Sequence, residues 1–109
     1  MKAAIQLLVA RSADSILVLG DMKELGNTEN EMHADVGRFA KAAGLKKLFC
    51  YGQLTQNTAT AFGDHALHFK DHQSLIDSLK PQLTPQTTVL VKGSRSMKME
   101  TVVAGLVMK

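Results

Sequence analysis

Short aliphatic runs alternate along the chain with segments in which apolar residues recur every three or four positions. The aliphatic runs predict buried strands, and the wider spacing predicts amphipathic helices. Four strands are predicted, at residues 15–20, 47–52, 66–69 and 87–93. Five helices are predicted, at residues 3–11, 29–43, 53–62, 72–80 and 96–108.

This regular alternation of helix and strand indicates the fold class. It favours an α/β, Rossmann-like architecture, an open and mostly parallel sheet with helices on both faces. The 109 residues are enough for one domain, and the chain has no linker, repeat or low-complexity stretch. We therefore expect a single domain over residues 1–109.

Several helix boundaries carry local signals. Thr28 and Glu31 form a T-x-x-E motif, which predicts a capping box at the start of the second helix. Gly44 predicts the end of that helix, and Asp71 predicts a capped start for the fourth. Ser96 is the expected N-cap of the last helix.

The composition narrows the classes of partner. The formal net charge is +3 and the sequence pI is about 9.2, which favours an anionic ligand. Aromatic residues make up only 5%, and stacking surfaces for single-stranded nucleic acid usually need them, so we expect no nucleic-acid partner. No apolar run approaches the roughly 18 residues that span a membrane, so we expect no membrane partner either. The single cysteine, Cys50, is expected to be a buried, reduced thiol in a cytoplasmic protein.

The candidate chemistry gathers where the first and fourth strands end, because ligands of open α/β sheets bind beyond the carboxyl ends of the strands. Gly20-Asp21 follows the first strand, and the segment KGSRSMK follows the fourth. Glycine lets a backbone approach a ligand, and arginine can bind a carboxylate or phosphate through two hydrogen bonds. Lys92, Arg95 and Lys98 therefore predict an anion receptor, with a plain solvated turn as the alternative.

Other candidate chemistries are weaker. Asp21 could hold an ammonium group, a metal-bound water or a ribose hydroxyl, or it could be a turn residue that bonds its own backbone. His33 lies near the start of the second helix, close to the same edge of the sheet. The spacing of His65, His68 and His72 is poor for a metal, so no metal site is predicted. The chain has no G-x-x-x-x-G-K-[ST] motif and hence no P-loop of its own.

Two long segments carry a family resemblance. ILVLGDMKELGNTENEMHADVG and VLVKGSRSMKME closely resemble the C-terminal domain of the Mur ligases, and the resemblance covers nearly the whole chain. Within that family they look most like the members that add D-alanyl-D-alanine to UDP-N-acetylmuramoyl-tripeptide. The resemblance implies a cytoplasmic, three-domain, ATP-dependent amide-bond ligase of peptidoglycan synthesis. In such an enzyme the C-terminal domain closes over the nucleotide and helps to bind the incoming amino compound.

The resemblance also implies roles for individual residues. Substrate-binding positions would be Asp21, His33, Lys92, Gly93, Ser94 and Arg95. Met22, Glu24, Leu25 and Gly26 belong to the first motif. No catalytic or metal-binding residue is expected in this chain. ATP and Mg²⁺ would be bound mainly by domains that the chain lacks, and none is expected in this chain alone.

The chain also departs from the family pattern. It begins just after the position of the family's N-terminal strand and its N-A-N-P segment, so we expect a fragment that is inactive alone. If that strand once paired with residues 15–20, its loss would leave them at an exposed sheet edge and favour self-association; alternatively, the missing strand lay at the outer edge and the remaining sheet is self-sufficient. Two alternatives stay open: a free-standing α/β module for a small anionic or phosphorylated ligand, and an interaction domain without a small ligand.

Overall fold

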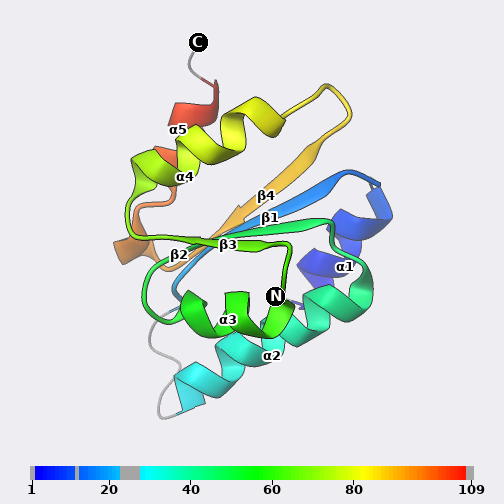
Figure 1. Cartoon of the computed structure of the whole chain (residues 1–109), viewed down its shortest axis with the longest axis vertical. Coiled ribbons are helices and arrows are strands. Elements are labelled where there is room, and N and C mark those ends of the chain that lie inside the picture. Colours follow the sequence, from blue (N-terminus) through cyan, green and yellow to red (C-terminus); the bar gives the residue numbers. More distant parts are fainter. Residues whose placement is uncertain (1, 12, 23–27, 108–109) are drawn as a thin grey trace.

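The computed structural model describes residues 2–11, 13–22 and 28–107. Four parallel strands form one sheet in the order β3-β2-β1-β4 (Figure 1). The strands are β1 Ser15–Gly20, β2 Lys47–Tyr51, β3 Ala66–Phe69 and β4 Thr88–Lys92. The helices are α1 Lys2–Arg11, α2 Glu29–Ala43, α3 Thr55–Phe62, α4 His72–Leu79 and α5 Glu100–Val107, with 3₁₀ turns at Lys80–Gln82 and Arg95–Met97. The predicted parallel α/β fold is confirmed.

The sheet is the middle layer of three. Helices α1, α2 and α3 cover one face, and α4 and α5 cover the other (Figure 1). All six residues of β1 are buried, and their side chains alternate between the two faces. Leu17 and Leu19 belong to the core under α1–α3, whereas Ile16 and Val18 belong to the core under α4 and α5. A strand buried on both faces explains the continuous aliphatic run.

The position of β1 corrects one expectation. Strand β1 pairs with β2 on one side and with β4 on the other, so residues 15–20 do not form an open edge. The chain runs from β1 to β2 and β3 over one face, and α4 then carries it back across the other face to β4. Because α4 crosses the opposite face from α2 and α3, a connection of the usual handedness returns the chain in the opposite direction and places β4 beyond β1. Within the described chain, the edge strands are β3 and β4.

Two of the helix signals behave as predicted. Gly44 ends α2 in the left-handed conformation, with φ 91°. The Asp71 side chain accepts a hydrogen bond from the Ser74 N–H at 2.7 Å and so caps α4. The predicted capping box is wrong, because Thr28 precedes α2 but its side chain forms no hydrogen bond that caps the helix. The Glu31 carboxylate instead accepts from Arg38 at 2.6 Å.

The last predicted helix is interrupted. Residues Arg95–Met97 form a 3₁₀ turn, Lys98 adopts a left-handed conformation with φ 51°, and α5 begins only at Glu100. Ser96 is therefore not the N-cap of a helix, and that prediction is wrong. The turn brings Met99 into the core, where it is 6% exposed. Burial of this side chain outweighs the cost of one left-handed residue.

Among the helices described here, none is both long and apolar enough to cross a bilayer.

Candidate functional site

The candidate site lies where the strand order changes direction. The chain leaves β1 toward β2 and later returns to β4 on the opposite side of β1. A crevice at such a point, beyond the carboxyl ends of the strands, is the usual ligand site of open α/β sheets. In Figure 1 these ends lie on the left, where the turn after β4 is close to the end of β1.

Backbone hydrogen bonds join the two loops that the sequence singled out. The Ser94 N–H donates to the Asp21 carbonyl at 2.9 Å, which ties the loop after β4 to the end of β1. One residue further, the Met22 N–H donates to Nε2 of His33 at 3.0 Å. The structure thus brings Asp21, Ser94 and His33 together, although 73 positions separate Asp21 from Ser94 in the sequence.

Asp21 is an internal anchor. The residue is 3% exposed, and its Oδ1 accepts a hydrogen bond from the Thr55 N–H at 2.9 Å. This bond satisfies a donor in the first turn of α3, which would otherwise be buried without a partner. Gly52 lies against the carboxylate in a left-handed conformation, with φ 115°, and a side chain there would collide with Asp21. The carboxylate therefore ties the end of β1 to the start of α3.

His33 is also engaged by the backbone. It is 2% exposed, and its Nδ1 lies 2.7 Å from the Glu29 carbonyl oxygen. Because Nε2 accepts from an N–H and Nδ1 faces a carbonyl, the ring must be neutral and carry its proton on Nδ1. Both nitrogens are thereby used, so His33 offers no ring nitrogen to a ligand while these bonds persist.

Gly20 and Gly93 allow neighbouring groups to pack closely, because neither residue has a side chain. A Cβ on Gly93 would lie 2.7 Å from Cγ of Met99 and 3.2 Å from Cα of Gly20. A Cβ on Gly20 would lie 2.7 Å from the Met99 sulfur. The sequence suggested that the glycines let a ligand approach the backbone, but in the structure the Met99 side chain fills that room. What the missing side chains permit is close contact between the ends of β1 and β4 beneath Met99.

Exposed positive charge follows β4. Lys92, Arg95 and Lys98 are all exposed, and none of them forms an ion pair with another described residue. Their side chains can therefore bind an anion without first giving up a partner. This segment retains the charge predicted for an anion receptor. The receptor would consist of exposed side chains around the 3₁₀ turn Arg95–Met97, because α5 begins only at Glu100.

His72 is a site residue that the sequence reasoning missed. Its Nε2 lies 2.8 Å from the Met97 carbonyl oxygen, and its ring centroid lies 4.3 Å from that of Tyr51. It therefore connects the start of α4 to the turn after β4. The available signal was a histidine directly after the cap residue Asp71, at the carboxyl end of a strand, where a side chain can reach neighbouring loops.

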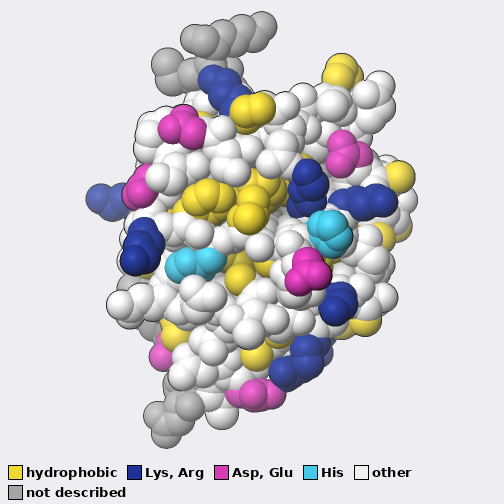
Figure 2. Space-filling view, viewed as in Figure 1, with side chains coloured by type: hydrophobic (Ala, Val, Ile, Leu, Met, Phe, Trp, Pro, Cys, Tyr) yellow, Lys and Arg dark blue, Asp and Glu magenta, His cyan; other side chains and the backbone are white. Residues whose placement is uncertain are grey.

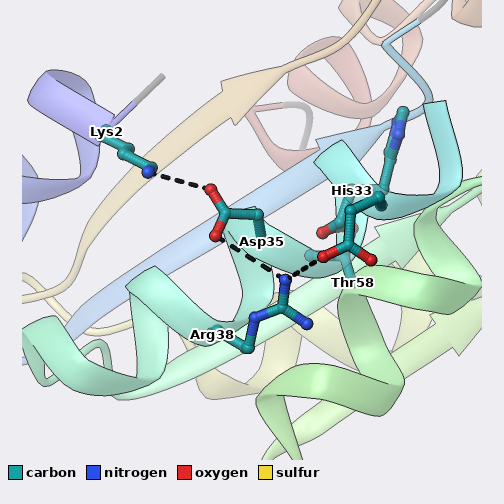
Figure 3. Close-up of polar contacts among 6 residues, drawn as sticks. Lys2, His33, Asp35, Arg38 and Thr58 are labelled. Carbon is teal, nitrogen blue, oxygen red and sulfur yellow. Dashed lines mark hydrogen bonds and ion pairs between the residues drawn. The ribbon is translucent and has the colours of Figure 1, made fainter. Parts of the chain in front are cut away.

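A cavity of about 750 Å³ adjoins the first loop, between the N-terminal ends of α1 and α2. Its walls are mostly apolar and include Leu19, Met22 and Val36. At the rim, Lys2 pairs with Asp35 at 2.9 Å, and Arg38 pairs with Glu31 (Figure 3). The hydrogen bond and charge of Lys2 lower the pKa of Asp35. The motif residues Glu24, Leu25 and Gly26 lie outside the described residues.

The other reactive side chains are not arranged for catalysis. Burial raises the pKa of the Cys50 thiol, and the nearby Asp21 carboxylate raises it further. A thiol that resists ionisation is a poor nucleophile, which fits the predicted buried cysteine. Within the described segments no three potential metal ligands come together. The imidazole Nε2 of His68 is occupied by the Gly52 carbonyl.

Comparison with known proteins identifies the family. Residues 1–95 match the model of the "Mur ligase, glutamate ligase domain". The chain is 43% identical, over 97% of its length, to the UDP-N-acetylmuramoyl-tripeptide–D-alanyl-D-alanine ligase of Escherichia coli. It covers 24% of that enzyme, so the chain spans about a quarter of the length of this relative.

Solved structures agree with the match. A MurF structure from Acinetobacter baumannii superimposes with a TM-score of 0.84 and 29% identity, over 97% of this chain and 24% of that one. MurF from Thermotoga maritima, solved in complex with ADP, superimposes with a TM-score of 0.82 over 94% of this chain and 24% of that one. At 22% identity, this second likeness concerns the fold alone. On the family match, the sequence identity and the shared fold, the chain belongs to the Mur ligase family and corresponds to its C-terminal, glutamate ligase domain.

Proposed function

We propose that this chain is the part of a longer ATP-dependent ligase that binds the incoming D-alanyl-D-alanine, for addition to UDP-N-acetylmuramoyl-tripeptide in cytoplasmic peptidoglycan synthesis. The observation that carries the proposal is the hydrogen bond from Ser94 to Asp21, which joins two loops at the point where the strand order reverses. Beside this junction, Lys92 and Arg95 are exposed. The name of the E. coli relative supplies the identity of the substrates.

The proposed chemistry of this domain is recognition of a carboxylate. Arg95 would bind the dipeptide carboxylate through its planar guanidinium, with Lys92 adding charge and the Gly93-Ser94 segment supplying polar groups at short range. Asp21 and His33 would support the site by holding the loops in place. In the complete enzyme the dipeptide amine would then attack an acyl phosphate formed elsewhere in the protein, and release of phosphate would complete the amide bond.

ATP and Mg²⁺ do not fit this chain as their main binding site. The sequence has no G-x-x-x-x-G-K-[ST] loop for the β- and γ-phosphates. The described residues provide no group of three potential metal ligands. We therefore assign the nucleotide and the metal to other parts of the longer protein.

Substitution of Arg95 in the full-length ligase tests the proposal. Arg95→Ala removes a charge-assisted contact worth about 1.5–3 kcal/mol, so kcat/KM for D-alanyl-D-alanine should fall by roughly tenfold to a hundredfold. Arg95→Lys should recover only part of this loss, because an ammonium group cannot form the same paired bonds. Arg11→Ala, at the far end of α1, is the matched control. An unchanged kcat/KM in Arg95→Ala would remove Arg95 from the site.

The isolated chain should not hydrolyse ATP. It has no P-loop, and phosphoryl transfer depends on groups that position the phosphates and the metal. Phosphate release by the purified chain, with ATP, Mg²⁺ and both substrates present, should equal that of a heat-treated sample. Substrate-dependent release well above that sample would contradict the assignment.

A further inference from the structure

Two buried or half-buried histidines hold the two loops of the site. His33 contacts the backbone of the loop after β1, at Met22, and His72 contacts the turn after β4, at Met97. Each histidine belongs to the first turns of a helix, α2 for His33 and α4 for His72. The Ser94–Asp21 bond then joins the two loops to one another.

The two histidines use opposite hydrogen-bonding roles. His33 accepts an N–H at Nε2, so that nitrogen must lack a proton. His72 faces a carbonyl oxygen with Nε2, so that nitrogen must carry a proton. An imidazolium has two N–H groups and no acceptor, and it can therefore replace neutral His72 but not neutral His33.

We propose that His33 is a positioning residue whose neutral form is required to hold the loop after β1, whereas His72 holds the turn after β4 in either protonation state. Acidification would break the Met22–His33 bond, because two N–H groups would then face each other. The Met97–His72 bond would persist. One half of the site would thus be sensitive to protonation of its histidine, and the other half would not.

Charged and polar groups surround both histidines. Near His33, α1 contributes Lys2, and the end of β1 contributes Asp21. Helix α2 contributes the carboxylates of Glu29, Glu31 and Asp35. Helix α3 contributes only the hydroxyls of Thr55 and Thr58. Figure 3 shows the His33 ring pointing away from the ion pairs of Asp35 and Arg38. All of these groups remain in a His33→Gln chain, so that variant separates their effect from the protonation of His33. Around His72 the corresponding groups are Asp71 and Tyr51.

Nuclear magnetic resonance of the ¹⁵N-labelled chain tests the assignment without any ligand. Long-range ¹H–¹⁵N spectra report which imidazole nitrogen carries the proton. At about pH 8 we expect the proton of His33 on Nδ1 and that of His72 on Nε2. On acidification from about pH 8, the exchange protection of the Met22 amide should fall by about tenfold, after correction for the intrinsic rate, once the spectra show that His33 is protonated. Protection of the Lys98 amide, which donates to the Arg95 carbonyl, should persist.

Variants separate the proposed role from a merely structural one. His33→Gln keeps an acceptor that does not titrate, so the pH dependence of Met22 protection should disappear. The control His65→Gln replaces an exposed histidine and should leave the pH dependence of Met22 protection unchanged. A proton on Nε2 of His33 in the unmodified chain would overturn the proposal, even if His33→Gln did not fold. Survival of the Met22 transition in a folded His33→Gln chain would overturn it as well.

The consequence for binding rests on the proposed function. Titration with D-alanyl-D-alanine should give weaker binding at about pH 5 than at pH 8 in the unmodified chain, and a smaller difference in His33→Gln. Absence of dipeptide binding at both pH values would count against the proposed function alone, because the proton positions and amide protection are measured without the dipeptide. A dipeptide affinity with the same pH dependence in both chains would contradict the proposed link between His33 and the site.

Discussion

Asp21 and His33 are polar side chains at the carboxyl edge of the sheet, and both are buried because they satisfy backbone groups. Asp21 accepts from the Thr55 N–H, and His33 accepts from the Met22 N–H. A buried donor without a partner costs more than a typical hydrogen bond contributes. These residues therefore hold the loops in place, and exposed Arg95 and Lys92 are left for the proposed contact with a ligand.

Asp21→Ala should lower the free energy of unfolding by about 1–3 kcal/mol, because it leaves the buried Thr55 N–H without an acceptor. Asp21→Asn keeps an oxygen at the same place and should cost less. Urea unfolding at neutral pH measures both values. Asp64→Ala is the control, since Asp64 is exposed and surface changes usually stay within about 0.5 kcal/mol. Equal stabilities for Asp21→Ala and the unmodified chain would show that water satisfies Thr55.

At the scale of elements, α2 and α3 pack so closely that a glycine is needed between them. Gly37 lies within α2, and a Cβ there would collide with the backbone carbonyl of Thr58 and approach the Ala61 side chain. Thr58 also donates its hydroxyl to the His33 carbonyl at 2.8 Å, which fixes α3 against α2. The same packing therefore supports the residue that holds the loop after β1.

Gly37→Ala should destabilise the chain by about 1–3 kcal/mol, although glycine-to-alanine changes in helices usually stabilise by about 0.5–1 kcal/mol. The sign reverses because the obstacle is backbone and cannot rotate away. Gly105→Ala in α5 is the matched control, since its nearest obstacle is Cδ1 of Ile76, the movable end of a side chain, at 2.5 Å. Thermal unfolding compares the two variants. A Gly37→Ala chain as stable as the unmodified one would show that the helices can separate at little cost.

At the scale of the whole molecule, the open edge at β4 is flanked by apolar surface on both faces. A groove of about 300 Å³ lies on the α1 side and includes Leu7, which is 69% exposed. A groove of about 310 Å³ lies on the α5 side and includes Val91 and Val103. Edge strands of this kind are templates for pairing with another chain. The expected self-association therefore belongs to β4 and not to residues 15–20.

The purified chain should form dimers or larger species as its concentration rises, and Leu7→Glu should reduce this association by placing a charge beside β4. Sedimentation over a wide concentration range measures both. Leu67→Glu is the control at the opposite edge, in β3, where Leu67 is 44% exposed. Figure 2 shows that hydrophobic side chains are also exposed in the middle of the face drawn there. A single monomer mass up to about millimolar concentration would show that the β4 edge does not associate. Equal loss of association in both variants would implicate the β3 edge as well as the β4 edge.

Much of the fold could be predicted because its signals are local. The aliphatic runs predicted β1–β4 to within a residue or so, Gly44 and Asp71 predicted helix boundaries, and the alternation of elements predicted a parallel sheet. The capping box at Thr28 failed, because a favourable motif does not oblige the side chain to form the bond. The prediction that Ser96 is a helix N-cap failed, because burial of the Met99 side chain outweighed the preference of a serine for that position.

The sequence by itself determined the strands, most of the helices and the position of the charged segment after β4, since each depends on residues close together in the chain, and it identified the family through two motifs. Only the tertiary structure decided that β1 is central, that Met99 fills the room beside Gly93, and that His33 is neutral while His72 is a donor. Those features depend on contacts between residues far apart in the chain. A sequence pattern states what a side chain can do, but the partner that the fold places beside it determines what it does.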